Sequence, residues 1–145
     1  MGANQPDAGP CLCNALRQAS RAVSRLYDDE MRAVGLRTTQ FSLLRALRAS
    51  GEVRQGDLGE LALLDDTTLT RNLRPLVKKN WVAVRAGKDR RERLVTITDV
   101  GAAKLREARS AWARAQQHMR TLLSEGVWQE LLQALPEVAR VSAEA

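Results

Sequence analysis

A single change of periodicity constrains the fold of this chain more than any other feature. In the segment 66–79 the apolar residues recur at helical spacing, whereas the segments 81–84 and 93–98 alternate as strands do. The residues between the two strand-like segments, 87–92, form a polar turn with three basic side chains. The sequence therefore predicts a helix followed directly by a β-hairpin with a basic tip. Pro75 lies inside the helical segment, where its missing N–H predicts a local kink.

Three helices are expected before this unit, at about 12–35, 38–49 and 55–63, because apolar residues recur there at helical spacing. The third of them is short. Its inward-facing residues are predicted to be Leu58, Leu61 and Ala62. Helices that lead into a basic hairpin indicate a mainly α fold with a small β-hairpin wing, which is the plan of a winged helix-turn-helix.

Two long helices are expected after the hairpin. A cap at Thr98 or Asp99 begins the first, which runs to about Leu123, and Gly126 is expected to separate it from the second. Asn80 is expected to end the helix before the hairpin by taking the left-handed conformation. The apolar side of the last helix is formed by Trp128, Leu131, Leu132, Leu135 and Val138.

The distribution of charge points to a nucleic-acid partner. The formal net charge is +6, and the segment 66–93 alone holds nine Lys/Arg against three Asp/Glu. The remaining residues hold fourteen of each sign and are neutral as a group. A neutral body with one basic segment predicts a phosphate-binding face. Aromatic residues make up only 3% of the chain, which argues against a stacking platform for single strands.

Neither a membrane segment nor a secretory signal is expected. No apolar run approaches the roughly 18 residues that a membrane-spanning helix needs. The first ten residues lack the basic start and the apolar centre of a signal peptide. We therefore expect a cytoplasmic protein with no membrane partner.

The helix at 66–79, above all its N-terminal part, and the hairpin turn carry the residues that we expect to contact DNA. In a helix-turn-helix the second helix enters the major groove with its N-terminal residues at the base edges. Threonine can reach bases or phosphates, arginine can bind guanine through two hydrogen bonds, and lysine suits phosphate. The candidates are Thr67, Thr68, Thr70, Arg71, Arg74 and Lys78, with Arg90 and Arg91 in the hairpin turn. A purely capping role for the first two threonines stays open.

Two runs of this sequence resemble the MarR family of transcriptional regulators. The run 69–82 is similar to the recognition helix and the following strand of that family. The run 89–101 is similar to its wing, an Asp-x-Arg turn that leads into a strand ending in Thr98-x-x-Gly101. Asn80 stands where glycine is usual in the family. The likeness extends from Leu12 to the C-terminal helices.

The resemblance implies how the parts would work. Arg91 would enter the minor groove, and Asp65 would pair with the wing arginine and hold the wing against the recognition helix. The first, fifth and sixth helices would form a homodimer that binds a near-palindromic operator in double-stranded DNA. We therefore expect one compact domain whose parts are a flexible arm at 1–10, a dimerisation region at 11–35 and 99–145, and a DNA-binding region at 36–98.

Two cysteines and a tyrosine suggest one possible signal, an oxidant. Cys11 and Cys13 lie at a helix N-terminus, whose partial positive charge favours a thiolate. Together with Tyr27, this helix resembles the peroxide-sensing branch of the family. A cysteine at the Cys13 position is the reactive thiol there, and a tyrosine at the Tyr27 position hydrogen-bonds to it. This chain departs from that branch at Arg17 and Thr38, where further tyrosines are found. An unreactive thiol is the alternative.

A small aromatic or acidic molecule is the competing signal. Arg17 and Arg21 on the first helix could receive its carboxylate, although a solvated face explains them as well. No metal or other cofactor is expected. Cys11 and Cys13 point to nearly opposite sides of a helix, and His118 is the only histidine. A dimer would contain four cysteine sulfurs, so binding of a soft metal or an arsenical remains an alternative.

The sequence offers little to an enzyme. It has no phosphate-cradling glycine loop and no glycine-flanked nucleophilic serine. We therefore expect a regulator, most simply a repressor that an effector or thiol oxidation releases from DNA. A thiol peroxidase that uses Cys13 and an architectural DNA-binding protein without sequence preference are the alternatives.

Overall fold

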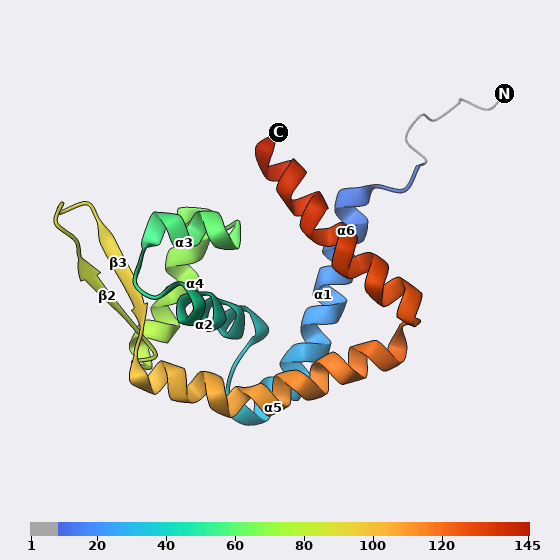
Figure 1. Ribbon diagram of the computed structural model, residues 1–145, viewed down its shortest axis with the longest axis horizontal. Helices are drawn as coiled ribbons and strands as arrows, with labels where there is room; N and C mark the ends of the chain where they lie inside the picture. The colour runs from blue at the N-terminus through green and yellow to red at the C-terminus, as the bar shows by residue number, and fades with distance from the viewer. Residues whose placement is uncertain (1–8) are drawn as a thin grey trace.

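The computed structural model of the protein describes residues 9–145, so the arm predicted at 1–10 lies outside it except for its last two residues. The predicted fold, mainly α with a small β-hairpin, is confirmed (Figure 1). The elements are α1 (Leu12–Met31), the 3-10 turn η1 (Arg32–Val34), α2 (Thr38–Ser50), β1 (Val53–Arg54), α3 (Gln55–Ala62), α4 (Asp66–Lys78), β2 (Val82–Ala86), β3 (Arg93–Ile97), α5 (Asp99–Leu122) and α6 (Glu125–Glu144). Within the described range, no helix has the length and apolar character needed to cross a bilayer.

Two lobes share the long helix α5. One lobe consists of α2, α3, α4 and the strands, and the other consists of α1 and α6 (Figure 1). The first half of α5 packs against α2, and α5 also packs along α1. The DNA-binding elements predicted from the sequence therefore sit together on one lobe, while the helices predicted to dimerise form the other.

The core lies in the first lobe, where the apolar faces of its helices meet the sheet. Leu58 of α3, Leu69 and Leu76 of α4 and Val95 of β3 are completely buried. Leu61, which the helical spacing predicted to face inward, is 63% exposed instead. In so short a helix Leu58 alone reaches the core among the large apolar residues, and Leu61 lies on the outer side.

The sheet has a third strand that the sequence did not reveal. Its order is β1-β3-β2, and all the pairs are antiparallel. Val95 in the central strand lies between Val53 of β1 and Val84 of β2. A strand of two residues is too short to show the alternation by which strands are recognised, so the pattern indicated only the hairpin.

The predicted helix ends are largely confirmed. Asn80 has a φ of 59° and follows α4, as expected of a residue that ends a helix in the left-handed conformation. The Thr98 side chain caps α5 by accepting a hydrogen bond from Gly101 N at 2.9 Å. Gly126 does not separate the last two helices. Ser124 caps α6, and Gly126 lies within its first turn.

Candidate nucleic-acid interface

One side of α4, the helix predicted to read DNA, is buried in the core, and its other sides are exposed to solvent. Leu69, Leu73 and Leu76 are buried and fix the helix against the lobe. The residues expected to contact DNA lie on the other faces, and all of them are exposed except Thr68, which is half-buried. They are Thr67, Thr68, Thr70, Arg71, Arg74 and Lys78. Pro75 lies within α4, which continues through it to Lys78.

Asp65 holds the N-terminus of α4. Its carboxylate accepts hydrogen bonds from the backbone N and from Oγ1 of Thr68, both at 2.8 Å. These hydrogen bonds lower the pKa of the Asp65 carboxyl below its usual value. Thr68 therefore has the structural role at the helix start that was left open above for Thr67 and Thr68. Thr67 and Thr70 remain exposed on the first turns of the helix.

A groove lies between α3, α4 and β2 on this exposed side. Its volume is about 380 Å³, and its lining includes Thr70, Arg74 and Lys78 of α4. Gln55, the first residue of α3, also lines it, and Gln55 Nε2 donates a hydrogen bond to Thr70 Oγ1 at 3.2 Å. Gln55 was not among the residues expected from the sequence, because no spacing pattern connects it with α4.

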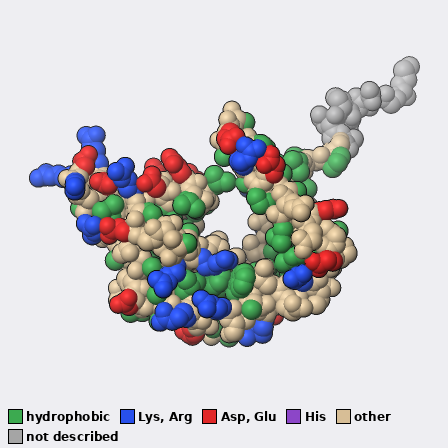
Figure 2. All heavy atoms as spheres, in the orientation of Figure 1, with side chains coloured by type: hydrophobic (Ala, Val, Ile, Leu, Met, Phe, Trp, Pro, Cys, Tyr) green, Lys and Arg blue, Asp and Glu red, His purple; other side chains and the backbone are tan. Residues whose placement is uncertain are grey.

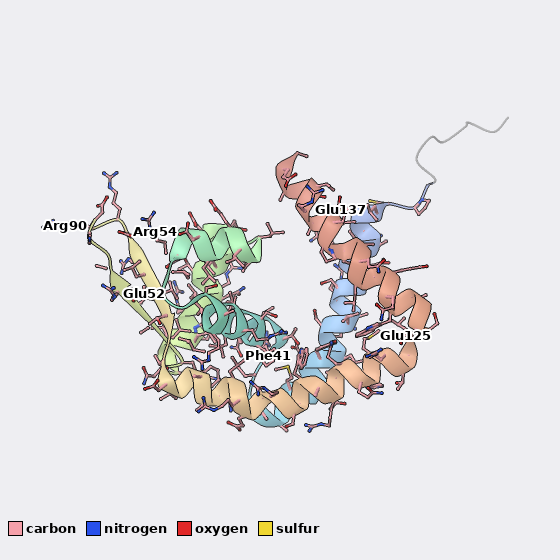
Figure 3. All side chains as sticks on the ribbon, in the orientation of Figure 1. Phe41, Glu52, Arg54, Arg90, Glu125 and Glu137 are labelled. Atoms are coloured by element: carbon pink, nitrogen blue, oxygen red, sulfur yellow. The ribbon has the colours of Figure 1, made fainter. Side chains whose placement is uncertain are left out.

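The hairpin places its basic tip away from the core. Gly87 N donates to the Glu92 carbonyl at 2.9 Å, and Glu92 N donates to the Asp89 carbonyl at 3.0 Å, so the turn closes on itself. Arg90 and Arg91 are exposed, and Figure 3 shows Arg90 at the end of the hairpin. Lys and Arg side chains gather at this end of the molecule in Figure 2. In a winged helix such a tip can contact DNA next to the major groove into which the recognition helix inserts.

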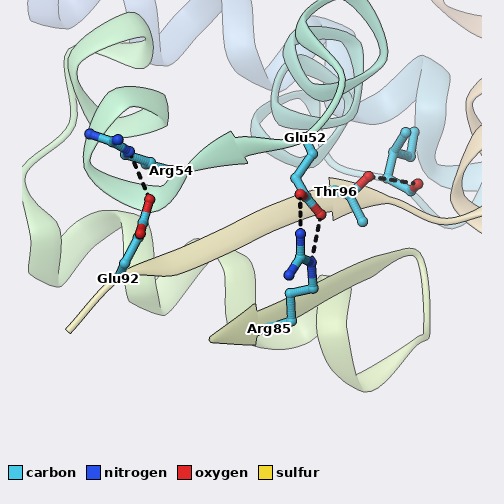
Figure 4. Close-up of polar contacts among 6 residues, drawn as sticks. Glu52, Arg54, Arg85, Glu92 and Thr96 are labelled. Atoms are coloured by element: carbon cyan, nitrogen blue, oxygen red, sulfur yellow. Dashed lines mark hydrogen bonds and ion pairs between the residues drawn. The ribbon is translucent and has the colours of Figure 1, made fainter. Parts of the chain in front are cut away.

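Two ion pairs join the hairpin to the segment around β1 (Figure 4). Arg54 Nε lies 2.8 Å from Glu92 Oε1, and Arg85 forms a two-pronged pair with Glu52. The contact expected from the family resemblance, between Asp65 and Arg91, is not formed among residues 9–145. The carboxylate of Asp65 is used by the α4 cap instead.

The cysteines lie at the start of α1, far from Tyr27. Cys11 is the N-cap residue, Cys13 is in the first turn, and both are exposed. Tyr27 donates a hydrogen bond from its hydroxyl to Gln116 Oε1 of α5, and burial raises the pKa of Tyr27. Fourteen helical residues span about 21 Å, so Cys13 and Tyr27 of one chain cannot meet. A contact like that of the peroxide-sensing branch would require a second chain.

The arginines that line an apolar cavity are not those expected from the sequence. Arg17 and Arg21 are exposed on α1. A cavity of about 360 Å³ lies between α2 and α5 instead. It is lined by Phe41, Arg45, Arg48, Ala49, Leu105, Arg109 and Trp112. We call it the α2–α5 cavity.

The floor of the α2–α5 cavity is aromatic and its rim is cationic. The rings of Phe41 and Trp112 stack at 6.0 Å, and the Arg45 guanidinium lies 5.1 Å from the Trp112 centroid. Figure 2 shows basic side chains around an apolar patch where α2 and α5 lie. None of Arg45, Arg48 and Arg109 is ion-paired with a carboxylate of the described residues. The sequence contained one sign of this cavity. Apolar and arginine residues share an i, i+4, i+7 spacing at 41–45–48 on α2 and at 105–109–112 on α5.

Known proteins share both the sequence pattern and the fold. The family model described as the MarR family matches residues 36–92. An uncharacterised HTH-type transcriptional regulator of Bacillus subtilis, YwoH, is 29% identical over 66% of this chain and 70% of its own length. The HTH-type transcriptional regulator SarZ of Staphylococcus epidermidis is 32% identical over 62% of each chain, so the match spans less than two thirds of that relative.

A solved structure extends the likeness to nearly the whole chain. The Mycobacterium tuberculosis transcriptional regulator MOSR, crystallised in complex with DNA, is 28% identical and has a TM-score of 0.84. The match covers 93% of this chain and 98% of that one. It therefore includes α1, α5 and α6 as well as the DNA-binding lobe. The chain is therefore similar to the MarR family over residues 36–92, and along nearly its whole length it has the winged helix-turn-helix fold of the DNA-binding transcriptional regulator MOSR.

Proposed function

We propose that the protein is a homodimeric repressor that binds a near-palindromic operator and leaves it when a small aromatic acid binds. The observation that carries this proposal is the joint display of two basic elements on one lobe. The first turns of α4 present Thr70 and Arg71, and the hairpin presents Arg91. A recognition helix in the major groove with a basic wing beside it can contact bases and phosphates together.

The support for a dimer is the apolar surface of the second lobe. α6 makes only sparse contacts with the rest of the described chain, and Trp128 is its one buried residue. Large apolar residues of α1, α5 and α6 are 40–65% exposed: Leu12, Leu122, Val127, Leu131, Leu132, Leu135 and Val141. A 20-residue helix with an uncovered apolar side gains its stability from packing against a partner. A second copy would cover this side and bring two recognition helices onto one face.

The support for an aromatic acid is the α2–α5 cavity. Its floor suits a flat ring, and its arginines could bind a carboxylate through two parallel hydrogen bonds. α2 packs against both α5 and α4, so a ligand wedged between α2 and α5 would press on the lobe that carries the recognition helix. That pressure would change the separation of the two recognition helices in a dimer and would favour release of DNA.

The experiment combines light scattering, on the full chain and on a truncated chain, with DNA binding by the full chain. Light scattering should give a dimer, and deletion of the residues after Gly126 should give monomer or aggregate. Binding to a selected operator should exceed binding to random DNA by several orders of magnitude. An architectural protein would show no such preference, and a monomeric full-length chain would contradict the dimer.

The effector is identified by titrating the operator complex with a panel of aromatic carboxylates. The wild type should release DNA, and Arg45→Gln or Arg109→Gln should require a higher concentration. The variant Arg17→Gln/Arg21→Gln is the matched control, because it removes two arginines from α1 outside the cavity. If the control alone loses the response, the site lies on α1 instead.

Thiol oxidation is the second candidate signal, because Cys13 is exposed and open to an oxidant. The same complex is titrated with an organic hydroperoxide. Release that disappears in Cys13→Ser would replace the aromatic acid by an oxidant as the signal. Turnover of the peroxide in the presence of a reductant would instead indicate a thiol peroxidase.

A further inference from the structure

We infer that Gln55 sets the base preference of Thr70 by fixing the direction in which the threonine hydroxyl donates its hydrogen bond. The inference rests on the proposed function, since it requires that the protein reads a specific operator. It concerns a residue of α3 that acts through a residue of the recognition helix. Gln55 is therefore a positioning residue.

Gln55 and Thr70 meet on the surface that faces DNA. Gln55 begins α3 and is half-buried, whereas Thr70 is exposed on α4. Gln55 Nε2 donates to Thr70 Oγ1 at 3.2 Å, and this is the one hydrogen bond found for the Thr70 side chain within residues 9–145. Both residues line the groove between α3, α4 and β2, next to Arg74 and Lys78.

The start of α3 also places Gln55 beside the wing. A second cavity, of about 440 Å³, lies between α3 and the hairpin, and Gln55, Arg91 and Glu92 are among its lining residues. Gln55 therefore stands between the recognition helix and the wing, at the place where a DNA duplex held by both would pass. In such a complex its amide would lie beside the Thr70 hydroxyl that contacts a base.

The chemistry follows from what a hydroxyl can offer. A threonine hydroxyl has one hydrogen to donate and two lone pairs that accept. The amide N–H of Gln55 occupies one lone pair, so the Thr70 hydrogen is free to point toward a base. It then finds an acceptor on guanine, adenine or thymine, whereas cytosine presents only its N4 donor in the major groove. Gln55 thus makes Thr70 a donor that disfavours cytosine at one position of each half-site.

The size of the effect is that of one hydrogen bond. Such a bond changes an equilibrium by roughly three- to tenfold. We expect the wild type to disfavour cytosine by this factor at one position, and Thr70→Val to lose the preference there and nowhere else.

The test compares base preferences, not overall affinity. Dissociation constants are measured for operators that carry each of the four base pairs at each position. Gln55→Met keeps the length of the side chain but removes the amide, so the discrimination against cytosine should fall to within about twofold. Gln55→Glu provides only acceptors and should draw the Thr70 hydrogen toward itself. The outward lone pairs should then accept from cytosine N4 or adenine N6, so the discrimination against cytosine should disappear and the two bases with an amino donor should be favoured over guanine and thymine.

The ratios of the dissociation constants for the four base pairs separate this effect from the negative charge that glutamate adds, because that charge lowers the affinity for every sequence equally. A Gln55→Met variant that loses affinity for all operators by one common factor would assign Gln55 to phosphate and overturn the inference. Unchanged preferences in Thr70→Val would overturn it as well. A wild-type chain that selects no sequence at all is a different result, because it overturns the proposed function on which the inference rests.

Discussion

Arg85 on β2 reaches across the central strand to Glu52, where Arg85 Nη2 lies 2.6 Å from Glu52 Oε1 and Arg85 Nε lies 2.9 Å from Glu52 Oε2 (Figure 4). Glu52 directly precedes β1, so this pair ties the hairpin to the strand that packs on its other side. Arg54 and Glu92 form a second tie nearer the tip. The direction in which the wing points is therefore set by side chains as well as by the sheet.

The Glu52–Arg85 pair predicts a pH dependence of stability. Hydrogen bonds from Arg85 lower the pKa of Glu52 below its usual value of 4.5 in the folded chain. A carboxyl with a lowered folded pKa stabilises the protein above its unfolded pKa, and this contribution is lost as the pH falls through the folded value. Glu52→Gln should therefore lower the melting temperature slightly at pH 7, and the difference should vanish in acid. Both groups are exposed, so a large difference at pH 7 would contradict this account.

Arg71 and Lys78 should differ in the kind of DNA binding that they support. Arg71 lies on the second turn of α4, where it can read a guanine, and Lys78 is the last residue of that helix. Arg71→Ala should weaken binding to the operator by about 1–3 kcal/mol more than binding to random DNA. Lys78→Ala should weaken both equally. Equal losses for Arg71→Ala, measured by competition binding, would make Arg71 a phosphate contact.

Arg91 should contribute to DNA affinity without supporting the fold. Its side chain is exposed, and its backbone N donates to Asp89 Oδ1 at 3.2 Å, a bond that survives truncation of the side chain. Arg91→Ala should lower operator affinity and reduce the slope of log K against log salt by about 1 per chain. The melting temperature and the oligomeric state should stay the same. Undiminished binding in a shift assay would remove the wing from the mechanism.

The local rules that predicted the fold act between neighbours in the sequence. Asp65 caps α4 through Thr68, three residues away, and Thr98 caps α5 through Gly101, also three residues away. Asn80 can end α4 because an asparagine tolerates the left-handed conformation. The cap at Thr98 and the helix end at Asn80 were expected from the residue types at those positions, and the changes of periodicity placed the other helix starts and the hairpin to within a few residues.

The features that the sequence did not reveal depend on contacts between distant segments. Val53 becomes a strand residue only because Val95 lies beside it. Gln55 is noticeable only because it forms a hydrogen bond with Thr70, and Arg45 only because it lies over the ring of Trp112, which belongs to a helix far along the chain. Spacing along one helix cannot show which second helix will lie against it. The candidate DNA-binding residues could therefore be proposed from the sequence, whereas the spacings on α2 and α5 did not show that these two helices would enclose a cavity.

Gly101 is the position where we expect a single methyl group to do most damage. A Cβ built on Gly101 would lie 2.0 Å from the carbonyl oxygen of Trp81 and 2.8 Å from its carbonyl carbon. The same carbonyl oxygen accepts a hydrogen bond from Thr98 N at 3.0 Å. The first turn of α5 therefore lies directly on the backbone that leads into β2, and only glycine permits this approach.

Gly101→Ala should destabilise the protein by about 2–4 kcal/mol, because the first turn of α5 must move away from Trp81 and give up its bond to that carbonyl. Gly126→Ala is the matched control. Gly126 lies inside α6 with no atom near enough to meet a new Cβ, so alanine should be neutral or should raise stability by up to about 1 kcal/mol. Urea unfolding of the two variants at one protein concentration measures both values. If Gly101→Ala proves as stable as the wild type, the start of α5 has room that the fold described above does not allow.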